Sequence, residues 1–293
     1  MKLEYIVDNL TKYETIKQVL KEEFLMSDRL IKKLKQSNQI YLNNIPININ
    51  KTLKIDNSLT INLDFVETSD NIVPTEMELD ILYEDDALLI VNKPPFMPVH
   101  PSMDHFEDSL SNGVKYYFNS IGLKRKIRPV NRLDKNTSGI VIFAKNEYIQ
   151  ECLIKQMKSS NFRKEYLALI DGILEENNQI INAPVSRKEN SIIERCVSLD
   201  GDVAITEVEL LNTFDNYSLI KCILKTGRTH QIRVHMKHIG HSILGDDLYG
   251  EKSELINRQA LHAYRVSFIH PIAKNKIEIL AELPKDIKNL IEK

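Results

Sequence analysis

The spacing of apolar residues divides the chain into segments of helical and of extended periodicity. Between residues 15 and 35 apolar side chains recur every three or four positions, which predicts helices, and Ser27 and Asp28 are typical of a helix start. From residue 40 to residue 65 apolar and polar residues alternate instead, as at 45–49 and 59–65, which predicts half-buried strands. We therefore expect residues 1–66 to form a small α+β module.

A polar stretch, residues 67–76, follows this module and has the composition of a linker. Beyond it the pattern predicts a larger domain, residues 77–293, which opens with a hairpin around residues 84–86. Later predicted strands cover residues 140–144, 166–171, 192–199, 203–211, 217–225, 259–268 and 276–280. Predicted helices cover residues 109–121, 147–158 and 229–239.

The order of these elements indicates the fold class. Strands mostly follow strands, which favours a mixed, mostly antiparallel sheet flanked by helices over a doubly wound parallel sheet. We therefore expect an α+β fold, with this larger domain preceded by the small α+β module. The chain contains neither a GxxxxGK[ST] nor a GxGxxG motif, so nothing supports a nucleotide cofactor.

The composition is that of an ordinary globular protein, with 42% hydrophobic and 27% charged residues. Its three cysteines, Cys152, Cys196 and Cys222, form no close pair, which argues against a disulfide framework and fits a reducing compartment. No stretch approaches the roughly 18 apolar residues of a membrane span, and the N-terminus lacks the apolar run of a signal peptide. We expect a cytoplasmic protein that does not contact a membrane.

Charge is unevenly distributed, although the formal net charge is only −2. Residues 121–170 hold 11 Lys and Arg against 4 Asp and Glu, and residues 221–241 hold 5 basic residues, 4 histidines and no acid. Local basic clusters of this kind bind phosphate backbones, although a solvated surface is the simpler interpretation. The near-neutral total argues against a protein that coats nucleic acid through bulk charge.

One basic segment contains an isolated acid. Asp134 lies among Arg132, Lys135 and small polar residues of the kind that form tight turns, directly before a predicted strand. Cations around a carboxylate keep it ionised, and an ionised carboxylate in a basic groove can act as a nucleophile or a general base. The alternative is an Asp that only caps its own turn.

The other basic segment, residues 224–235, combines a strand end with a helix start. Gly227 ends the strand, Thr229 is a candidate helix cap, and His230, Arg233 and Lys237 share one polar helix face. A metal site is the alternative, although no carboxylate or cysteine lies at matching ligand spacing nearby. Its candidate ligands are His230, His235, His238 and His241.

Taken together, these segments resemble the RluA-type family of RNA pseudouridine synthases. The family's Arg-Leu-Asp-x-x-Thr-Ser-Gly turn matches residues 132–139, its Lys-x-Tyr strand matches residues 164–166, and its Gly-Arg-Thr-His-Gln-Ile-Arg-Val-His motif matches residues 227–235. Residues 245–250 match its Gly-Asp-x-x-Tyr-Gly motif, and residues 92–94 with 99–101 resemble its N-terminal motif. Residues 1–66 resemble the S-four-like RNA-binding module that often precedes this catalytic domain. Asn131 departs from the pattern, since the family usually has His there.

The resemblance implies an enzyme that converts uridine in RNA to pseudouridine without a cofactor or a metal. Asp134 would be the nucleophile, either attacking C1′ or assisting formation of a glycal, and Arg233 would pair with it. Tyr166, which by itself reads as a core tyrosine, would stack on the uracil and assist proton transfer at C5. Arg132 would fill the space that the flipped-out uridine leaves. The other implied RNA contacts are Lys164, Thr137, Arg228 and His230.

Large-subunit ribosomal RNA is the expected substrate, with transfer RNA as the alternative. Base flipping costs a few kcal/mol in a paired stem and less in a loop, which favours loop or bulge uridines. Two other classes of function stay open at this point: an RNA-binding protein without activity, and a His-dependent metalloenzyme. We expect a monomer.

Overall fold

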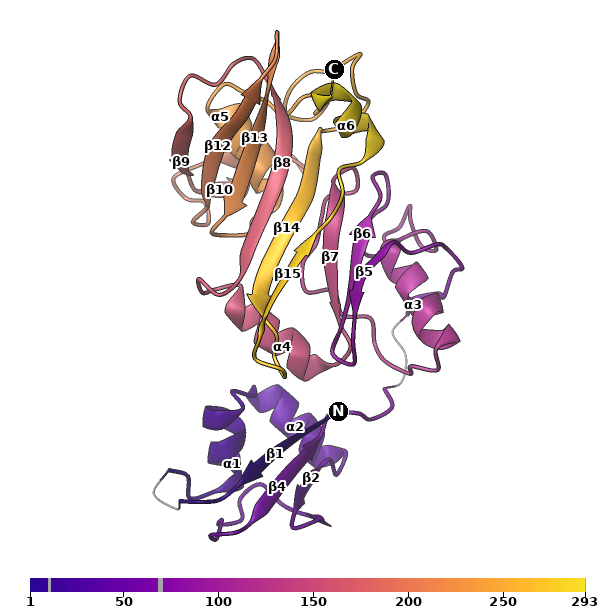
Figure 1. Ribbon diagram of the computed structural model, residues 1–293, viewed down its shortest axis with the longest axis vertical. Helices are drawn as coiled ribbons and strands as arrows, with labels where there is room; N and C mark the ends of the chain where they lie inside the picture. The colour runs from indigo at the N-terminus through magenta and orange to yellow at the C-terminus, as the bar shows by residue number, and fades with distance from the viewer. Residues whose placement is uncertain (10–11, 68–70, 293) are drawn as a thin grey trace.

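A computed structural model describes residues 1–9, 12–67 and 71–292 of the chain. A four-stranded sheet lies within residues 2–62 and a nine-stranded sheet within residues 81–280, one on each side of the predicted linker (Figure 1). Within the predicted linker, residues 68–70 lie outside the described residues. No helix in the described ranges is both long and apolar enough to cross a membrane.

The N-terminal module packs short helical segments against its sheet, whose strand order is β1-β4-β2-β3. The strands are β1 (Lys2–Ile6), β2 (Ile40–Leu42), β3 (Ile45–Pro46) and β4 (Ser58–Asn62). The helical segments are α1 (Ile16–Gln18), the π-helical turn η1 (Val19–Glu23) and α2 (Asp28–Gln36). The predicted start of α2 is confirmed, because Ser27 Oγ accepts a hydrogen bond from the backbone N–H of Leu30 at 3.1 Å.

Two expectations for this module differ from the structure. The strand predicted at residues 45–49 ends at Pro46, which has no N–H for the ladder, and the chain then turns at Asn48, whose carbonyl accepts a bond from Lys51 N at 3.2 Å. In addition, β1 is not predicted by the pattern, because only five alternating residues are available to reveal it.

The large sheet is mixed and mostly antiparallel, as predicted, with the order β5-β6-β7-β14-β8-β13-β12-β9 and β15 beside β14. Among the strands described, β7 and β14 form the one parallel pair. The strands are β5 (Ile81–Glu84), β6 (Leu88–Lys93), β7 (Ser138–Ala144), β8 (Arg163–Asp171), β9 (Asn178–Asn182), β12 (Ile205–Thr213), β13 (Tyr217–Leu224), β14 (Leu261–Ile269) and β15 (Lys276–Leu280).

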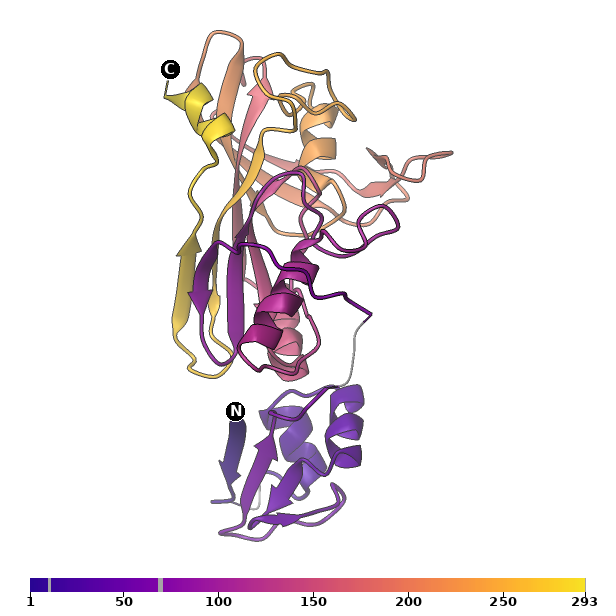
Figure 2. The ribbon, with the colours of Figure 1, turned by 90° about the vertical axis from the view of Figure 1, so that its right-hand side faces the viewer.

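Helices α3, α4 and α5 lie on one face of this sheet, and α6 lies near its end at the C-terminus (Figures 1 and 2). Their bounds are α3 (Leu110–Ser120), α4 (Glu147–Gln156), α5 (Gln231–His238) and α6 (Lys285–Ile291). A separate two-stranded hairpin, β10 (Val185–Arg187) and β11 (Arg195–Val197), projects from the body (Figure 2). The sequence pattern predicts α3, α4 and α5 but not α6, β9 or β10.

The strand predicted at residues 192–199 is mostly the tip of this hairpin. Only Arg195–Val197 pairs as a strand, and Ile192 and Ile193 are 85% and 62% exposed. An Ile-Ile pair has high strand propensity, but here neither side chain has a sheet face to pack on. The apolar pattern therefore overestimates this strand.

A tight junction between β7 and β14 sets the position of the turn that carries Asp134. Gly139 has a φ of +112°, and a Cβ at this position would lie 2.3 Å from the carbonyl oxygen of Ala263. Only glycine fits such a conformation at such a separation. The Arg-Leu-Asp turn therefore enters β7 directly against β14, next to β8.

Buried ion pairs and a continuous apolar core join the module to the larger domain. Apolar residues of the module, β6, β7 and α4 belong to one cluster. The Glu67 side chain is 4% exposed and accepts hydrogen bonds from Arg128 at 2.6 and 2.7 Å and from Lys33 at 2.5 Å. Burial raises the pKa of Glu67, but these hydrogen bonds outweigh it and lower the pKa to about 2. The first residue of the predicted linker is therefore an anchor between the two parts.

We expect Glu67→Gln to lower the free energy of unfolding at neutral pH by about 2–3 kcal/mol, because Arg128 and Lys33 lose a buried anionic partner. The pKa of Glu67 is lower in the folded than in the unfolded protein, so the stabilisation is present above pH 4.5 and is lost as the pH falls toward 2. Urea unfolding at several pH values should show the two proteins converging over that range. Glu278→Gln, which removes an exposed partner of Arg265, should leave the midpoint nearly unchanged.

Candidate active site

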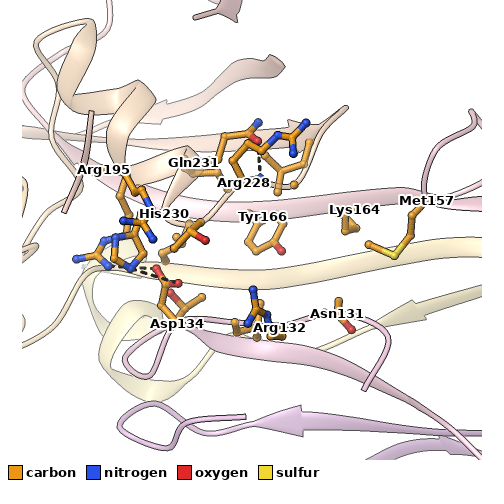
Figure 3. Close-up of a pocket in the computed structure, with 18 of the residues that line it drawn as sticks. Asn131, Arg132, Asp134, Met157, Lys164, Tyr166, Arg195, Arg228, His230 and Gln231 are labelled. Atoms are coloured by element: carbon orange, nitrogen blue, oxygen red, sulfur yellow. Dashed lines mark hydrogen bonds and ion pairs between the residues drawn. The ribbon is translucent and has the colours of Figure 1, made fainter. Parts of the chain in front are cut away.

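Motifs far apart in the sequence meet in one pocket of about 590 Å³ (Figure 3). The turn before β7, the start of β8 and the first turn of α5 form its walls. All eight predicted site residues line it: Asp134, Arg233, Tyr166, Arg132, Arg228, His230, Lys164 and Thr137. The structure thus brings together residues that the sequence separates by as many as 101 positions.

Arg233 is held between two carboxylates at one end of the pocket. Its Nε and Nη2 each donate to Asp246 at 2.7 Å, and its Nη1 donates to Asp134 Oδ2 at 3.1 Å. Asp246 is fully buried, whereas the Asp134 side chain is 26% exposed and faces the pocket. Burial lowers the pKa of Arg233, but the two carboxylates raise it by more than burial lowers it, so the guanidinium stays charged. The bidentate bond to Asp246 therefore fixes Arg233 with one N–H aimed at Asp134.

Asp246 is a residue of this site that the charge pattern does not identify. The sequence shows only a turn-rich Gly-Asp-Asp segment, and the family motif is the one signal that marks its first aspartate. In the structure Asp246 Oδ1 also accepts from the backbone N–H groups of Leu248 and Tyr249, both at 3.2 Å. The Tyr249 ring centroid lies 4.9 Å from Arg233 Cζ, so the ring covers the guanidinium.

The turn that carries Asp134 is held from behind by buried polar side chains. Each of residues 135–138 is hydrogen-bonded to a side chain from elsewhere in the chain. These bonds join Lys93 Nζ to Lys135 O (3.0 Å), Arg258 Nη1 to Asn136 O (3.0 Å), Gln259 Nε2 to Thr137 Oγ1 (3.2 Å) and His262 Nδ1 to Ser138 Oγ (2.9 Å). The turn is therefore a fixed support and not a mobile loop.

Among these supporting side chains, Lys93 and Arg258 are both fully buried. Burial and the nearby charge of Arg258 lower the pKa of Lys93 to about 7, against a smaller opposite effect from Asp134. Arg258 also forms a two-point ion pair with Asp286 of α6, at 2.7 and 2.9 Å. The motif at residues 92–94 marks Lys93 in the sequence. Arg258 is not marked, because it lies in a loop with no distinctive pattern.

Tyr166 and Lys164 point into the pocket from β8 (Figure 3). Burial and the nearby Asp134 raise the pKa of Tyr166, so its side chain is a neutral phenol. Burial lowers the pKa of Lys164 to about 8. A Cβ at Gly227 would lie 3.3 Å from Lys164 Nζ, so this glycine leaves room for the ammonium group.

Cations dominate the rest of the lining. Arg132 and Arg228 are exposed, and Arg228 also contacts Asp202 at 3.3 Å. Arg195, from β11, is a lining cation that the sequence does not mark. Thr137 is only 2% exposed and accepts its bond from Gln259, which places it under the turn more than on the RNA-facing surface. With Asp134 as the single lining acid, the pocket is suited to a polyanion.

The predicted cap of α5 is wrong. Thr229 does not cap this helix; His230 occupies the cap position, with φ 58° and ψ 18° in the left-handed region. No side chain in the described part of the chain caps α5; the side chain of Gln231 instead holds the turn before the helix, since its Oε1 accepts from Arg228 N and from Thr226 Oγ1, both at 2.9 Å. A buried glutamine that reaches back over its own turn leaves no local sequence signal.

The histidines of the alternative metal site face different partners. His235 contacts Thr206 Oγ1 and Ala183 O, both at 2.9 Å, and His241 contacts Asp171 O at 3.0 Å. Within the described ranges, no group of three or more His, Cys, Asp or Glu side chains could hold a metal ion.

Comparison with known proteins identifies the family. Residues 87–238 match the model of the RNA pseudouridylate synthase family. "Uncharacterized RNA pseudouridine synthase YhcT" of Bacillus subtilis (strain 168) is 36% identical over 98% of this chain and 96% of its own. "Ribosomal large subunit pseudouridine synthase D" of Zymomonas mobilis is 36% identical over 75% of this chain and 74% of its own. The chain therefore belongs to the RNA pseudouridylate synthase family, of the RluA type, and is an isomerase.

Solved structures agree on the fold. "Human RNA Pseudouridylate Synthase Domain Containing 1" superposes with a TM-score of 0.58 at 23% identity, covering 78% of this chain and 96% of its own. "Human RNA Pseudouridylate Synthase Domain Containing 4" gives 0.59 at 20% identity, covering 72% and 91%. At these identities the likeness shows the architecture alone.

We expect Arg233→Ala to lose stability as well as activity. Without the guanidinium, Asp246 is a buried carboxylate with no cation beside it, which costs about 3–5 kcal/mol of unfolding free energy. Combining Arg233→Met with Asp246→Asn removes both buried charges and should recover most of that stability. Pseudouridine formation should stay low in the double variant, because Asp134 still lacks its cation. Urea unfolding and turnover measured together test this, and restored turnover in the double variant would contradict it.

Proposed function

We propose that this protein isomerises specific uridines to pseudouridine in structured RNA, with Asp134 as the nucleophile. The observation that carries the proposal is the pocket itself, in which a single carboxylate is surrounded by cations and lies next to a tyrosine. Asp134 Oδ2 accepts a hydrogen bond from Arg233, whereas Oδ1 accepts none from the described residues and lies 3.8 Å from His230 Nε2. One oxygen is thus fixed and the other is available to react.

The reaction exchanges one bond to the ribose for another. The N1–C1′ bond breaks, the detached uracil turns, C5 bonds to C1′, and the proton on C5 is lost while N1 regains one. Asp134 takes part either by attacking C1′ or by assisting formation of a glycal, and both routes need its ionised form. Arg233 Nη1 lies 3.1 Å from Asp134 Oδ2, so a cation stands beside this carboxylate.

Neighbouring side chains would receive the flipped-out base. Tyr166 offers the face of a neutral phenol to the uracil, which suits stacking. A neutral phenol already carries its hydroxyl proton. Tyr166 can therefore accept the proton from C5 only if it gives up its own hydroxyl proton at the same time. Arg132 is exposed at the pocket rim and would fill the place of the flipped uridine, a substitution that reduces the cost of extrusion.

Large-subunit ribosomal RNA is the proposed substrate, and transfer RNA is the alternative. Support comes from relatives named ribosomal large subunit pseudouridine synthase D, which match about three quarters of this chain. The two basic segments supply pocket cations for the RNA backbone, and loop or bulge uridines cost least to flip. The protein would act as a monomer in the cytoplasm, which the three free cysteines fit.

The N-terminal module would extend the RNA contact. The proposed chain consists of an S-four-like module at residues 1–66, a linker at 67–76 and a catalytic domain at 77–293. Arg29, Lys32 and Lys35 of α2 are exposed, so they are accessible to phosphate groups.

Asp134→Asn should abolish turnover while leaving folding and RNA binding nearly intact, because the amide keeps the size of the side chain but cannot act as a nucleophile. The assay is tritium release from RNA labelled at uracil C5, extracted from cells that lack this gene and so contain the natural target unmodified. Asp247→Asn, an exposed aspartate beside Asp246, is the matched control and should retain full activity. Tritium release by Asp134→Asn would refute the assignment, and RNA binding without release by the unmodified protein would indicate the RNA-binding alternative.

Lys164 should make RNA affinity depend on pH. Its pKa in the free protein is about 8, so the ammonium that binds phosphate is present below pH 8 and is lost as the pH rises through that value. We expect the dissociation constant for the same RNA to rise several-fold between about pH 7 and pH 9. Lys164→Arg keeps its charge over this range and should flatten the profile; an unchanged slope would place the titrating group elsewhere.

A further inference from the structure

We propose that His230 positions the Asp134 carboxylate, in a tautomer set by Tyr249, and is not a contact to RNA. The inference rests on the proposed function, in which Asp134 is the nucleophile, and adds a residue that acts through it. It also replaces the role that the family resemblance suggested for His230.

A chain of polar contacts leads from the projecting hairpin to Asp134. The backbone N–H of Arg195, in β11, donates to Tyr249 Oη at 2.8 Å. Tyr249 Oη lies 2.8 Å from His230 Nδ1, and His230 Nε2 lies 3.8 Å from Asp134 Oδ1. Four segments distant in sequence are thus linked through one imidazole.

The direction of these contacts fixes the proton on His230. A backbone N–H can only donate, so Tyr249 Oη accepts from Arg195 and has its own hydroxyl proton to give. Of the described residues, His230 Nδ1 is the acceptor within reach of that hydroxyl. When Nδ1 accepts, the one proton of a neutral imidazole lies on Nε2, which faces Asp134.

The surroundings keep His230 neutral. Burial lowers its pKa, and the facing charges of Arg233 and Arg195 lower it further, while those of Asp134 and Asp246 act in the opposite direction. Tyr249, which contacts His230 Nδ1, is a phenol whose pKa is raised mainly by burial, so it keeps its proton.

The position of His230 also argues against contact with RNA. Its side chain is only 12% exposed, and its ring meets the Tyr249 ring edge-on with centroids 5.6 Å apart. The neighbouring Arg228, by contrast, is exposed. A buried imidazole offers little surface to a polyanion.

His230 can orient the carboxylate without occupying its reactive oxygen. A separation of 3.8 Å exceeds a hydrogen bond, so Oδ1 keeps its lone pairs while the Nε2–H dipole attracts it. Arg233 holds the other oxygen at 3.1 Å. Together the two groups limit rotation of the Asp134 side chain, and misplacing a nucleophile by about 1 Å can cost ~100-fold in rate.

The test uses the full chain under single-turnover conditions, with enzyme in excess over tritium-labelled RNA from cells that lack this gene. His230→Ala should lower the maximal rate about 10- to 100-fold with little change in the half-saturating enzyme concentration. His230→Gln should recover part of that rate, since its amide N–H can take the place of Nε2–H. A higher half-saturating concentration with an unchanged maximal rate would overturn the proposal and restore an RNA contact.

A second variant separates tautomer control from simple packing. Tyr249→Phe leaves His230 Nδ1 without its donor, so a form with a bare Nε2 facing Asp134 becomes populated and the rate falls. Protonation of the imidazole restores Nε2–H, and burial holds the pKa of His230 below 6.5. The rate of the variant relative to the unmodified protein should therefore rise as the pH falls below 6.5. A ratio independent of pH would overturn the proposal.

Two controls make failures distinguishable. Tyr217→Phe removes a hydroxyl that donates to Leu290 O at 2.8 Å; Tyr217 does not line the pocket, so both kinetic constants should stay unchanged. Thermal midpoints identify any variant that has lost its fold, and the Tyr249→Phe profile tests the proposal even if His230→Ala unfolds. If the unmodified protein releases no tritium, the proposed function fails; if it does and the variants depart from this pattern, only the role of His230 fails.

Discussion

The shared guanidinium of Arg233 is the interaction on which the site depends. A cation buried to this degree needs a buried anion, and Asp246 provides it through two bonds of 2.7 Å. Because that pair fixes the orientation of Arg233, only one N–H is left for Asp134, at 3.1 Å. The position of the proposed nucleophile is thus set from α5, almost a hundred residues further along the chain.

Such a pair places Asp134 reliably only if the turn that carries it is also fixed. Lys93, Arg258, Gln259 and His262 supply that rigidity by binding residues 135–138 one after another. Arg258 in turn is paired with Asp286, so the C-terminal helix α6 is part of the support. His230 lies beside the other oxygen of Asp134, Oδ1, and is itself held by Tyr249. These buried polar groups are tolerated because each has a polar partner.

The junction with the N-terminal module follows this rule as well. Glu67 is buried because Arg128 and Lys33 both bind it, and the apolar cluster is continuous on either side. Composition alone predicted a linker at residues 67–76. A sequence does not show whether a glutamate such as Glu67 is exposed to solvent or buried between cations. The module is therefore attached through specific contacts, in a defined orientation relative to the pocket.

The sequence by itself determined the fold class, the helices α3, α4 and α5 and most strands of the large sheet, because periodicity is a local property of the chain. The eight residues that line the pocket were marked through the resemblance of their motifs to a family. Only the tertiary structure decided the pairing of Asp246 with Arg233, the places of Arg258 and Arg195, the buried role of Glu67, and the left-handed His230 in place of a Thr229 cap. Each depends on which charged or polar groups meet when distant segments pack, and the burial that makes those pairs strong does not exist before the chain folds.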